Sequence, residues 1–389
     1  MFVRAITDIY YTITITMKSI KTTQEELYPS GYDAILDRIA SIDTIAYSPS
    51  RNYIDGAVSY LSPYISRGVI STQFVYQSLL KRGVQPSAMT KFIQELAWRD
   101  YWQLIWVEKG DAINTDLKHR QTAVTSYEIS SALVRAKTGI KAIDEALTIF
   151  YQTGYLHNHL RMYIASIACN IAQNHWKHPA QWMYYYLLDA DWASNALSWQ
   201  WVAGSNSNKK YYANQENINT FCYSDQTGTF LDVSYDDFAN LPIPEVLKPT
   251  EILRLKTQLP VQGAVKIDSK LPTLIYNFYN LDPLWRSDEA VNRVLLLEPS
   301  HFEMFPVSQK TIDFVIELSK NIKDIQIIVG EFSEIKPTYL SNGVVFFKEH
   351  PLNSHYVGNE DSREWMFSVK GFYPSFFAFW KKCKKEIQW

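Results

Sequence analysis

The spacing of hydrophobic residues changes between residues 231 and 271, and this change constrains the fold more than any other feature. From residue 25 to residue 231, apolar residues recur every three or four positions, as on the buried face of an amphipathic helix. After residue 270, short β-type runs alternate with helical patterns. Strands that alternate with helices are typical of a mainly parallel sheet. The sequence therefore predicts a mainly α protein, with a helical domain over 25–231 and a smaller C-terminal α/β domain over 271–389.

The two patterns also predict individual elements. We expect helices at 70–81, 91–109, 140–153, 157–175, 179–188, 309–322 and 367–387, and strands at 274–278, 294–297, 325–329 and 344–347. Residues 232–270 are rich in Pro, Asp and Lys, which predicts a linker. Residues 1–24 form an N-terminal extension in this scheme, either a strand or a poorly ordered segment.

Composition narrows the class of protein. The chain has 38 basic and 40 acidic residues, which argues against a protein that coats DNA but allows one that grips it in a local cleft. Cys169, Cys222 and Cys383 show neither metal-binding spacing nor a disulfide framework, so we expect a reducing, cytoplasmic setting. No run is apolar enough to predict a membrane span.

Residues 187–204 concentrate the side chains best suited to a cofactor. Asp189 and Asp191 are followed by Asn195, Trp199 and Trp201, and four-residue steps from Asp191 place Asn195 and Trp199 on one side of a helix. Carboxylates accept hydrogen bonds, an amide donates and accepts, and an indole can stack or carry an electron. A polar heteroaromatic cofactor needs this mixture, whereas a plain core helix would carry leucine there.

A second stripe lies on the helix expected at 91–109. Glu95, Trp98, Arg99 and Trp102 share one helix face, and charged groups are costly to bury unpaired. The stripe indicates a binding surface, and the alternative is a solvated, partly amphipathic helix.

Two further segments suggest polar contacts to a ligand. Ser59 and Ser62 lie near an expected helix start, which suits a phosphate, although either serine could simply cap that helix. In 153–162, Arg161 can pair with an acid such as Asp189. His157 and His159 point to different helix faces and predict no metal site.

These segments resemble the photolyase/cryptochrome family over roughly residues 45–205. The resemblance rests on Tyr-Leu-Ser-Pro-Tyr at 60–64, Glu-Leu-Ala-Trp-Arg-Asp-Tyr at 95–101, Thr-Gly-Tyr-Leu-His-Asn at 153–158, and Asp-x-Asp-x-Ala-x-Asn with Trp-Gln-Trp at 189–201. The chain departs from the family at Val58, at His159, and over 209–217. The family usually carries its α/β domain before the helical one, whereas here the α/β pattern follows it.

The resemblance implies light-driven repair of cyclobutane pyrimidine dimers in DNA, with electron transfer from photoexcited reduced FAD to a flipped-out dimer. The protein would be a deoxyribodipyrimidine photo-lyase, a monomer with non-covalent FAD, with dimer-containing DNA as its partner and no metal. Its domain over 25–231 would bind both FAD and DNA. A cryptochrome-like blue-light photoreceptor and a (6-4) photolyase remain alternatives, and an antenna chromophore stays open.

The resemblance also assigns roles to individual residues. The catalytic residues would be Glu95, Asn195, Trp199 and Trp176. The residues that hold the cofactor would be Tyr47, Ser59, Tyr60, Leu61, Ser62, Arg99, Arg161, Asp189, Asp191 and Asn195. The residues that contact DNA or the lesion would be Arg51, Glu95, Trp98, Asn158, His159, Met162 and Trp201.

Electrons would reach the flavin through Trp199 and Trp176, which match the proximal and middle members of the family's tryptophan chain. No Trp occurs between Trp106 and Trp176, where the third member usually lies. The relay is either shorter or continues through a residue such as Tyr127 or Trp182.

Overall fold

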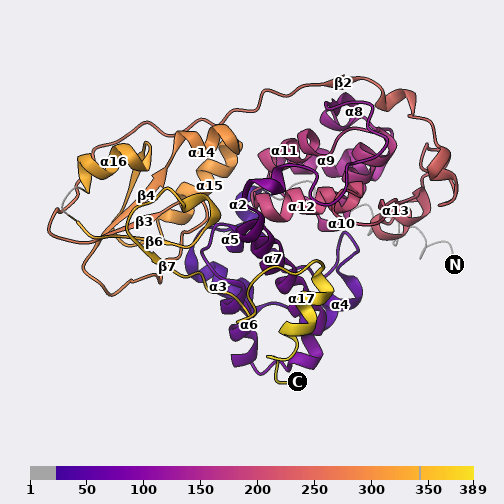
Figure 1. Ribbon diagram of the computed structural model, residues 1–389. Helices are drawn as coiled ribbons and strands as arrows, with labels where there is room; N and C mark the ends of the chain where they lie inside the picture. The colour runs from indigo at the N-terminus through magenta and orange to yellow at the C-terminus, as the bar shows by residue number, and fades with distance from the viewer. Residues whose placement is uncertain (1–22, 341–342) are drawn as a thin grey trace, which may run out of the picture.

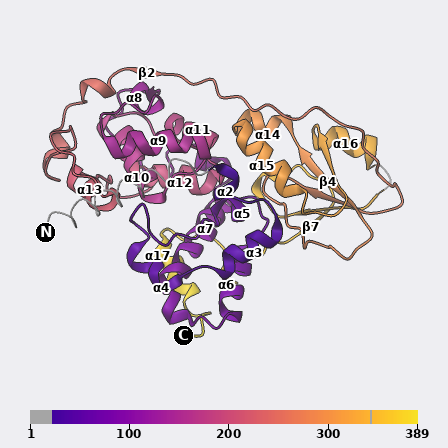
Figure 2. The ribbon, with the colours of Figure 1, turned by 180° about the vertical axis from the view of Figure 1, so that it is seen from behind.

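The structure is a computed structural model that describes residues 23–340 and 343–389. The predicted N-terminal extension lies outside these residues, apart from residues 23 and 24. The chain first forms a helical part and then an α/β part. In both views the α/β part lies to one side, and the helical part occupies the other side and the lower centre (Figures 1 and 2). This arrangement confirms the predicted fold class.

The helical part contains short and medium-length helices that pack around one core. They are α2 (Gln24–Leu27), α3 (Tyr32–Ala40), α4 (Thr44–Ser50), α5 (Ser62–Ser66), α6 (Thr72–Lys81), α7 (Thr90–Lys109), α8 (Ser131–Val134), α9 (Lys141–Thr153), α10 (Asn158–Ser166), α11 (Lys177–Tyr186), α12 (Trp192–Ala203) and α13 (Gln215–Cys222). The helices expected at 70–81, 91–109, 140–153 and 179–188 correspond to α6, α7, α9 and α11.

One predicted helix is too long. The pattern over 157–175 predicts a single helix, but α10 ends at Ser166 and a π-helical turn follows over Ile167–Ile171. The amide of Ala172 bonds to the carbonyl of Ile167, and Gln173 then adopts a positive φ of 54°, which a right-handed helix does not allow. Apolar spacing does not reveal this break, because all residues of the turn are buried.

The α/β part is built on a five-stranded parallel sheet with the order β5-β4-β3-β6-β7. Its elements are β3 (Thr273–Tyr276), β4 (Asn292–Leu297), α14 (Pro299–Met304), α15 (Gln309–Ser319), β5 (Ile325–Val329), α16 (Phe332–Tyr339), β6 (Val345–Lys348) and β7 (Asn359–Asp361). The four predicted strands are present. The edge strand β7 was not predicted, because its three residues are polar and have no apolar alternation.

Alternating residues of the central strands serve two separate cores. Leu274 and Leu295 belong to the large cluster that also contains the core of the helical part. Ile275 and Val294 face a smaller cluster with Phe332 of α16. Because successive side chains of a strand point to opposite faces, one face of the sheet joins the helical core and the other is covered by α16.

The C-terminal segment returns from the sheet to the helical part. The helix expected at 367–387 is shorter, as α17 (Phe376–Cys383), and it packs on α7 rather than on the sheet (Figure 1). The hydroxyl of Tyr101 on α7 donates to the carbonyl of Tyr373, which fixes the approach to α17. Both ends of the α/β part are therefore connected to the helical part.

Residues 232–270 contain little regular structure, in agreement with their composition. The two-residue strand β2 (Thr250–Glu251) pairs antiparallel with β1 (Ile129–Ser130) and holds this segment against the helical part. In the part of the chain that the structure describes, no helix is long and apolar enough to cross a membrane. The limits chosen for the four domains remain a prediction.

Candidate functional site

Arg99 forms the centre of a buried polar network. From α7 it donates to the hydroxyls of Ser62 at 2.6 Å and Ser66 at 2.8 Å, and to a carboxylate oxygen of Asp191 at 3.1 Å. Gln103, one turn further along α7, donates to both oxygens of Asp191 at 3.0 and 2.9 Å. A buried charge is stable only when it is paired and hydrogen-bonded, and this network meets that condition.

Asp191 also begins the helix that carries the other motif residues. It is the N-cap of α12, and its side chain accepts from the amide of Ser194 at 2.9 Å. An N-cap aspartate satisfies an amide that the helix leaves unpaired. One carboxylate therefore connects α7, α12 and, through Arg99, the serines of α5.

Asp189 and Arg161 make a second buried ion pair. The guanidinium of Arg161 donates from both terminal nitrogens to the two oxygens of Asp189, at 3.0 and 3.1 Å, and its Nε donates to the carbonyl of Leu156. Burial would raise the pKa of Asp189, but Arg161, Arg99 and Ser62 outweigh burial and hold that pKa below its ordinary value. Asp189 is therefore ionised at neutral pH.

Gly154 connects the two backbone segments that lead to Arg161 and Asp189. It ends α9 with a φ of 69°, and its carbonyl accepts from the amide of Leu188 at 3.0 Å. A Cβ at this position would lie 2.7 Å from the side chain of Leu188. Glycine permits both the left-handed conformation and the close approach.

The turn before α5 differs from an ordinary helix cap. The N-cap residue is Leu61, whose side chain makes no capping bond, so neither Ser59 nor Ser62 caps the helix. Tyr60 adopts a φ of 53°, an uncommon conformation for a bulky residue. The alternative prediction, in which Ser59 or Ser62 caps this helix, is therefore wrong. The helix itself is short, with five residues.

Asn195 sits on α12, which runs back along α11 after a connection of five residues. Such short connections make neighbouring helices antiparallel. The amide nitrogen of Asn195 donates to the carbonyl of Ala180 on α11 at 2.8 Å. Among the described residues, no hydrogen bond uses its amide oxygen, although the residue is only 8% exposed.

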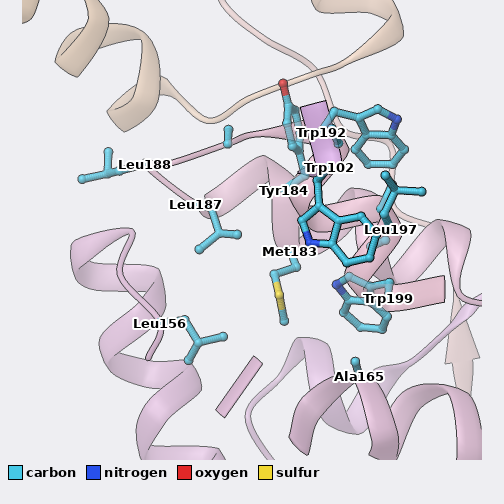
Figure 3. Packing of buried hydrophobic residues seen from close by; sticks show 14 of the residues in the cluster. Trp102, Leu156, Ala165, Met183, Tyr184, Leu187, Leu188, Trp192, Leu197 and Trp199 are labelled. Carbon is cyan, nitrogen blue, oxygen red and sulfur yellow. The ribbon is translucent and has the colours of Figure 1, made fainter. Parts of the chain in front are cut away.

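Trp199 and Trp176 each lie one helical turn from the hydrogen bond between Asn195 and Ala180. Trp199 follows Asn195 by four residues and Trp176 precedes Ala180 by four, so antiparallel helices bring the two indoles to the same level. Both are buried. Figure 3 shows Trp199 among buried side chains that include Met183 and Leu197.

The predicted lesion residues on α7 form a separate group near the end of α4. Glu95 pairs with Lys91 at 2.9 Å and lies 3.7 Å from Arg51. Tyr47 packs edge-on against Phe92, close to these charges. Arg51 and Glu95, both predicted to contact the lesion, thus lie close together. Glu95 already pairs with basic side chains of this chain, Lys91 and Arg51.

Trp98 is covered on one face. Its ring stacks on Phe376 of α17, with centroids 3.7 Å apart and planes 10° from parallel. A base cannot stack on that face while α17 is in place. Sequence reasoning missed this contact because the partners are far apart in the chain.

The remaining predicted contacts lie at or near the surface. Asn158 is exposed at the first turn of α10, Met162 is half-buried, and Trp201 is 38% exposed. His159 packs on Phe221 and Tyr163, and burial lowers its pKa to about 4. Among the described residues, no group of three or more His, Cys, Asp or Glu side chains could hold a metal ion.

Ser66, Gln103 and Arg363 were not predicted. Ser66 and Gln103 each lie four residues beyond a predicted residue, Ser62 and Arg99, and helical spacing could have identified them. Arg363 comes from the α/β part and donates to the amide oxygen of Gln103 at 2.8 Å. No local signal in the sequence indicates that contact.

The network borders a cavity of about 140 Å³ between the two parts of the chain. Arg99 and Gln103 line one side, and Asn277 and His350 line the other, just after β3 and β6. From β3 the chain proceeds to β4 and β5 on one side, and it then returns to the other side of β3 as β6, so the strand order reverses between β3 and β6. α/β sheets commonly bind ligands at such a point. The polar network is therefore continuous with that crevice.

Comparisons with known proteins show what this chain is similar to. A family model for the FAD binding domain of DNA photolyase matches residues 92–279. The deoxyribodipyrimidine photo-lyase of Agrobacterium fabrum is 31% identical over 192 residues, 46% of this chain and 40% of that protein. Cryptochrome-1 of Sinapis alba is 25% identical over 195 residues, 45% of this chain and 38% of that protein.

A solved cryptochrome structure from Synechocystis aligns with a TM-score of 0.45 at 24% identity, covering 56% of this chain and 48% of that one. The aligned part of the chain thus spans less than half the length of each of these relatives. The motifs on α5, α7, α10 and α12 come together in the structure, and α10, α12 and all but the first two residues of α7 lie within residues 92–279, which match the family model. Residues 92–279 therefore correspond to the FAD binding domain of the photolyase/cryptochrome family.

Proposed function

We propose that this protein binds FAD non-covalently and uses it, reduced and excited by light, to split cyclobutane pyrimidine dimers in DNA. The observation that carries the proposal is the pair of buried salt bridges, Arg161–Asp189 and Arg99–Asp191, beside Ser62 and Asn195. All six residues come from the predicted cofactor set. The match to a photolyase FAD-binding domain supports the same cofactor.

The residues present fit FAD by their hydrogen-bonding chemistry. Asn195 retains an amide oxygen that can accept from a protonated ring nitrogen. Ser59 and the strained Tyr60 lie in the turn before α5, where a diphosphate would meet hydroxyl and amide donors. When bound and reduced, FAD supplies the excited-state electron that opens the dimer.

The protein's own contribution is to bind and position. The salt bridges hold α7, α10 and α12 in fixed relation, so the groups around the cofactor are preorganised. Trp201 offers an exposed aromatic face for a flipped base, and stacking of this kind contributes on the order of 1–3 kcal/mol per base. Asn158 can bond to base edges.

Cofactor binding is tested by purification and denaturation. We expect a coloured protein with one FAD per chain that is released when the protein unfolds. A colourless protein that takes up no FAD on refolding would refute the proposal.

A cryptochrome-like photoreceptor is the second candidate, and one observation favours it. Phe376 of the C-terminal helix covers Trp98, as expected if α17 reports the state of this surface. Limited proteolysis in the dark and in blue light separates the two functions. Light-dependent cleavage near α17 without loss of dimers supports signalling, whereas loss of dimers without altered cleavage supports repair.

A further inference from the structure

The outer face of α17 carries positive charges that no described carboxylate neutralises. Phe376, Phe379 and Trp380 turn one face of this helix to the core. The other face and the turn that follows it are exposed and carry four lysines, Lys381, Lys382, Lys384 and Lys385. Within residues 23–340 and 343–389, the lysines that form salt bridges are four others, Lys91, Lys248, Lys320 and Lys348. The described chain therefore leaves the positive charge of this face unused.

This charge exceeds what the helix itself needs. Lys381 and Lys382, in the last turn of α17, oppose the negative end of the helix dipole, which is an ordinary arrangement. The other two lysines follow the last residue of the helix. The one acidic residue among residues 376–389, Glu386, accepts from the amide of Ser368 at 2.8 Å and from its hydroxyl at 2.7 Å. Because the whole chain has a formal net charge of −2, this face is a local exception.

An exposed aromatic ring lies among the lysines. Phe377 is 68% exposed, and Lys381 and Lys384 follow it by four and seven residues, so helical spacing puts them on the same side. Nucleic acids offer phosphates to ammonium groups and base faces to aromatic rings. A helix that lies on a membrane instead needs a broad free apolar face, but the apolar face of α17 packs on Tyr101 of α7 through Phe376. The chemistry of the outer face therefore fits nucleic acid.

The position of α17 places this face beside residues that are predicted to contact DNA. Phe376, which precedes Phe377 in the chain, stacks on Trp98 of α7. Both views show α17 beside α4, whose C-cap is Arg51 (Figures 1 and 2). Trp98 and Arg51 both belong to the set predicted to meet DNA or the lesion.

The start of α17 also adjoins the loop that follows α12. Lys118 donates to the carbonyl of Pro374 at 2.9 Å and to that of Asn206 at 3.5 Å. Trp201, the more exposed of the two predicted lesion tryptophans, precedes Asn206 by five residues. DNA that presents a base to Trp201 therefore has α17 beside it.

We propose that the outer face of α17, formed by Phe377 and the four lysines, binds the phosphate backbone of DNA that flanks the dimer. The inference rests on the proposed function, because that DNA is the proposed substrate. Phosphate contacts position DNA and carry no sequence information, so this face adds affinity without recognising the lesion. Since α17 lies outside residues 92–279, which match the FAD binding domain model, this surface is additional to that domain.

The salt dependence of DNA binding tests the charge of this face. A variant with glutamine at all four lysine positions should bind damaged and undamaged duplex DNA more weakly than wild type, with the same preference for damage. Each lysine that neutralises a phosphate contributes about 0.9 to the slope of log K against log salt concentration, so the slope should flatten by up to about 3.6. Arginine at the same four positions keeps the charge and should keep the wild-type slope.

The control variant removes the same number of lysines from the α/β part. It carries glutamine at four other exposed positions, Lys266, Lys270, Lys320 and Lys323. Its salt dependence should equal that of wild type, because the contact is local and does not follow from net charge. Both glutamine variants should keep the FAD content of wild type and unfold close to its urea midpoint, which shows that a change in binding arises in the folded protein. An unchanged slope in the α17 variant, or equal flattening in both variants, overturns the proposal.

The length of the DNA locates the contact. A pyrimidine dimer in a dinucleotide has no flanking phosphates, so wild type and the α17 variant should bind it equally. The difference between the two proteins should then appear as nucleotides are added on both sides of the dimer. A difference that is already complete with the dinucleotide would place the lysines at the dimer itself and would contradict the proposal.

Two further measurements separate this inference from its alternatives. Binding of undamaged duplex needs neither light nor FAD chemistry, so a flattened slope together with absence of repair by wild type refutes the repair function and leaves the α17 contact standing. Sedimentation with vesicles of phosphatidylserine and phosphatidylcholine tests a membrane surface as the partner. Lysine-dependent binding to these vesicles, with DNA binding unaffected by the substitutions, overturns the proposal in favour of lipid.

Discussion

The ring of Phe376 lies 3.7 Å from that of Trp98 and nearly parallel to it, so the C-terminal helix covers a surface that the sequence assigns to the lesion. Phe376 is buried and also contacts Trp380 and Tyr101. Trp98 therefore has a packing role in this structure, and under the proposed function the more exposed Trp201 is better placed to stack on a base.

Phe376→Ala should destabilise the protein without strengthening its binding to damaged DNA. Removing a buried phenylalanine typically costs about 3–5 kcal/mol, through lost burial and the cavity that remains. Urea unfolding gives the first quantity, and titration with dimer-containing DNA gives the second. Tighter binding to damaged DNA by the variant would show instead that α17 competes with the lesion.

Trp201→Ala should weaken binding to dimer-containing DNA while FAD content stays unchanged. Loss of one stacked base corresponds to roughly 1–3 kcal/mol, or about 5- to 150-fold in affinity. Undamaged DNA should bind weakly to both proteins, because the formal net charge is only −2. If the variant keeps its preference for damaged DNA, Trp201 does not form the pocket.

Asp189→Asn should lower both the free energy of unfolding and the FAD content. The substitution leaves the partly buried guanidinium of Arg161 without its counter-charge, and breaking a buried pair costs about 3 kcal/mol or more. The control is Glu317→Gln, which breaks the exposed pair with Lys320 and should cost at most about 1 kcal/mol. Equal effects of the two substitutions would contradict the role given to Asp189.

The stability of the protein should fall as the pH drops from about 6.5 to about 4. Burial lowers the pKa of His157 and of His159 from 6.5 to about 4 in the folded protein. In this window the unfolded chain binds protons that the folded protein does not, so acid favours unfolding. His159→Phe keeps the packing on Phe221 and should reduce the slope of the free energy of unfolding against pH. The control is His119→Phe at an exposed position, which should leave that slope unchanged.

Local patterns predicted the fold class, several of the longer helices and four of the five strands of the parallel sheet, because amphipathic spacing and β-type runs are properties of short segments. They failed where a distant segment decides the structure. The turn at Gln173 interrupts a continuous apolar pattern, and α17 packs on α7, which ends 267 residues before α17 begins. For the same reason, the sequence predicted only part of the polar network. Arg161–Asp189 follows from motif spacing, but the contact of Gln103 with Arg363 needs the α/β part in place.

The central claim is light-driven repair, and it is tested most directly with single-stranded DNA that contains cyclobutane dimers. Chemically reduced protein is incubated with this DNA under blue light and in the dark, and the remaining dimers are quantified. We predict that dimers disappear catalytically in the light and persist in the dark. Persistence of the dimers under both conditions, in protein that carries one reduced FAD per chain, would contradict the account.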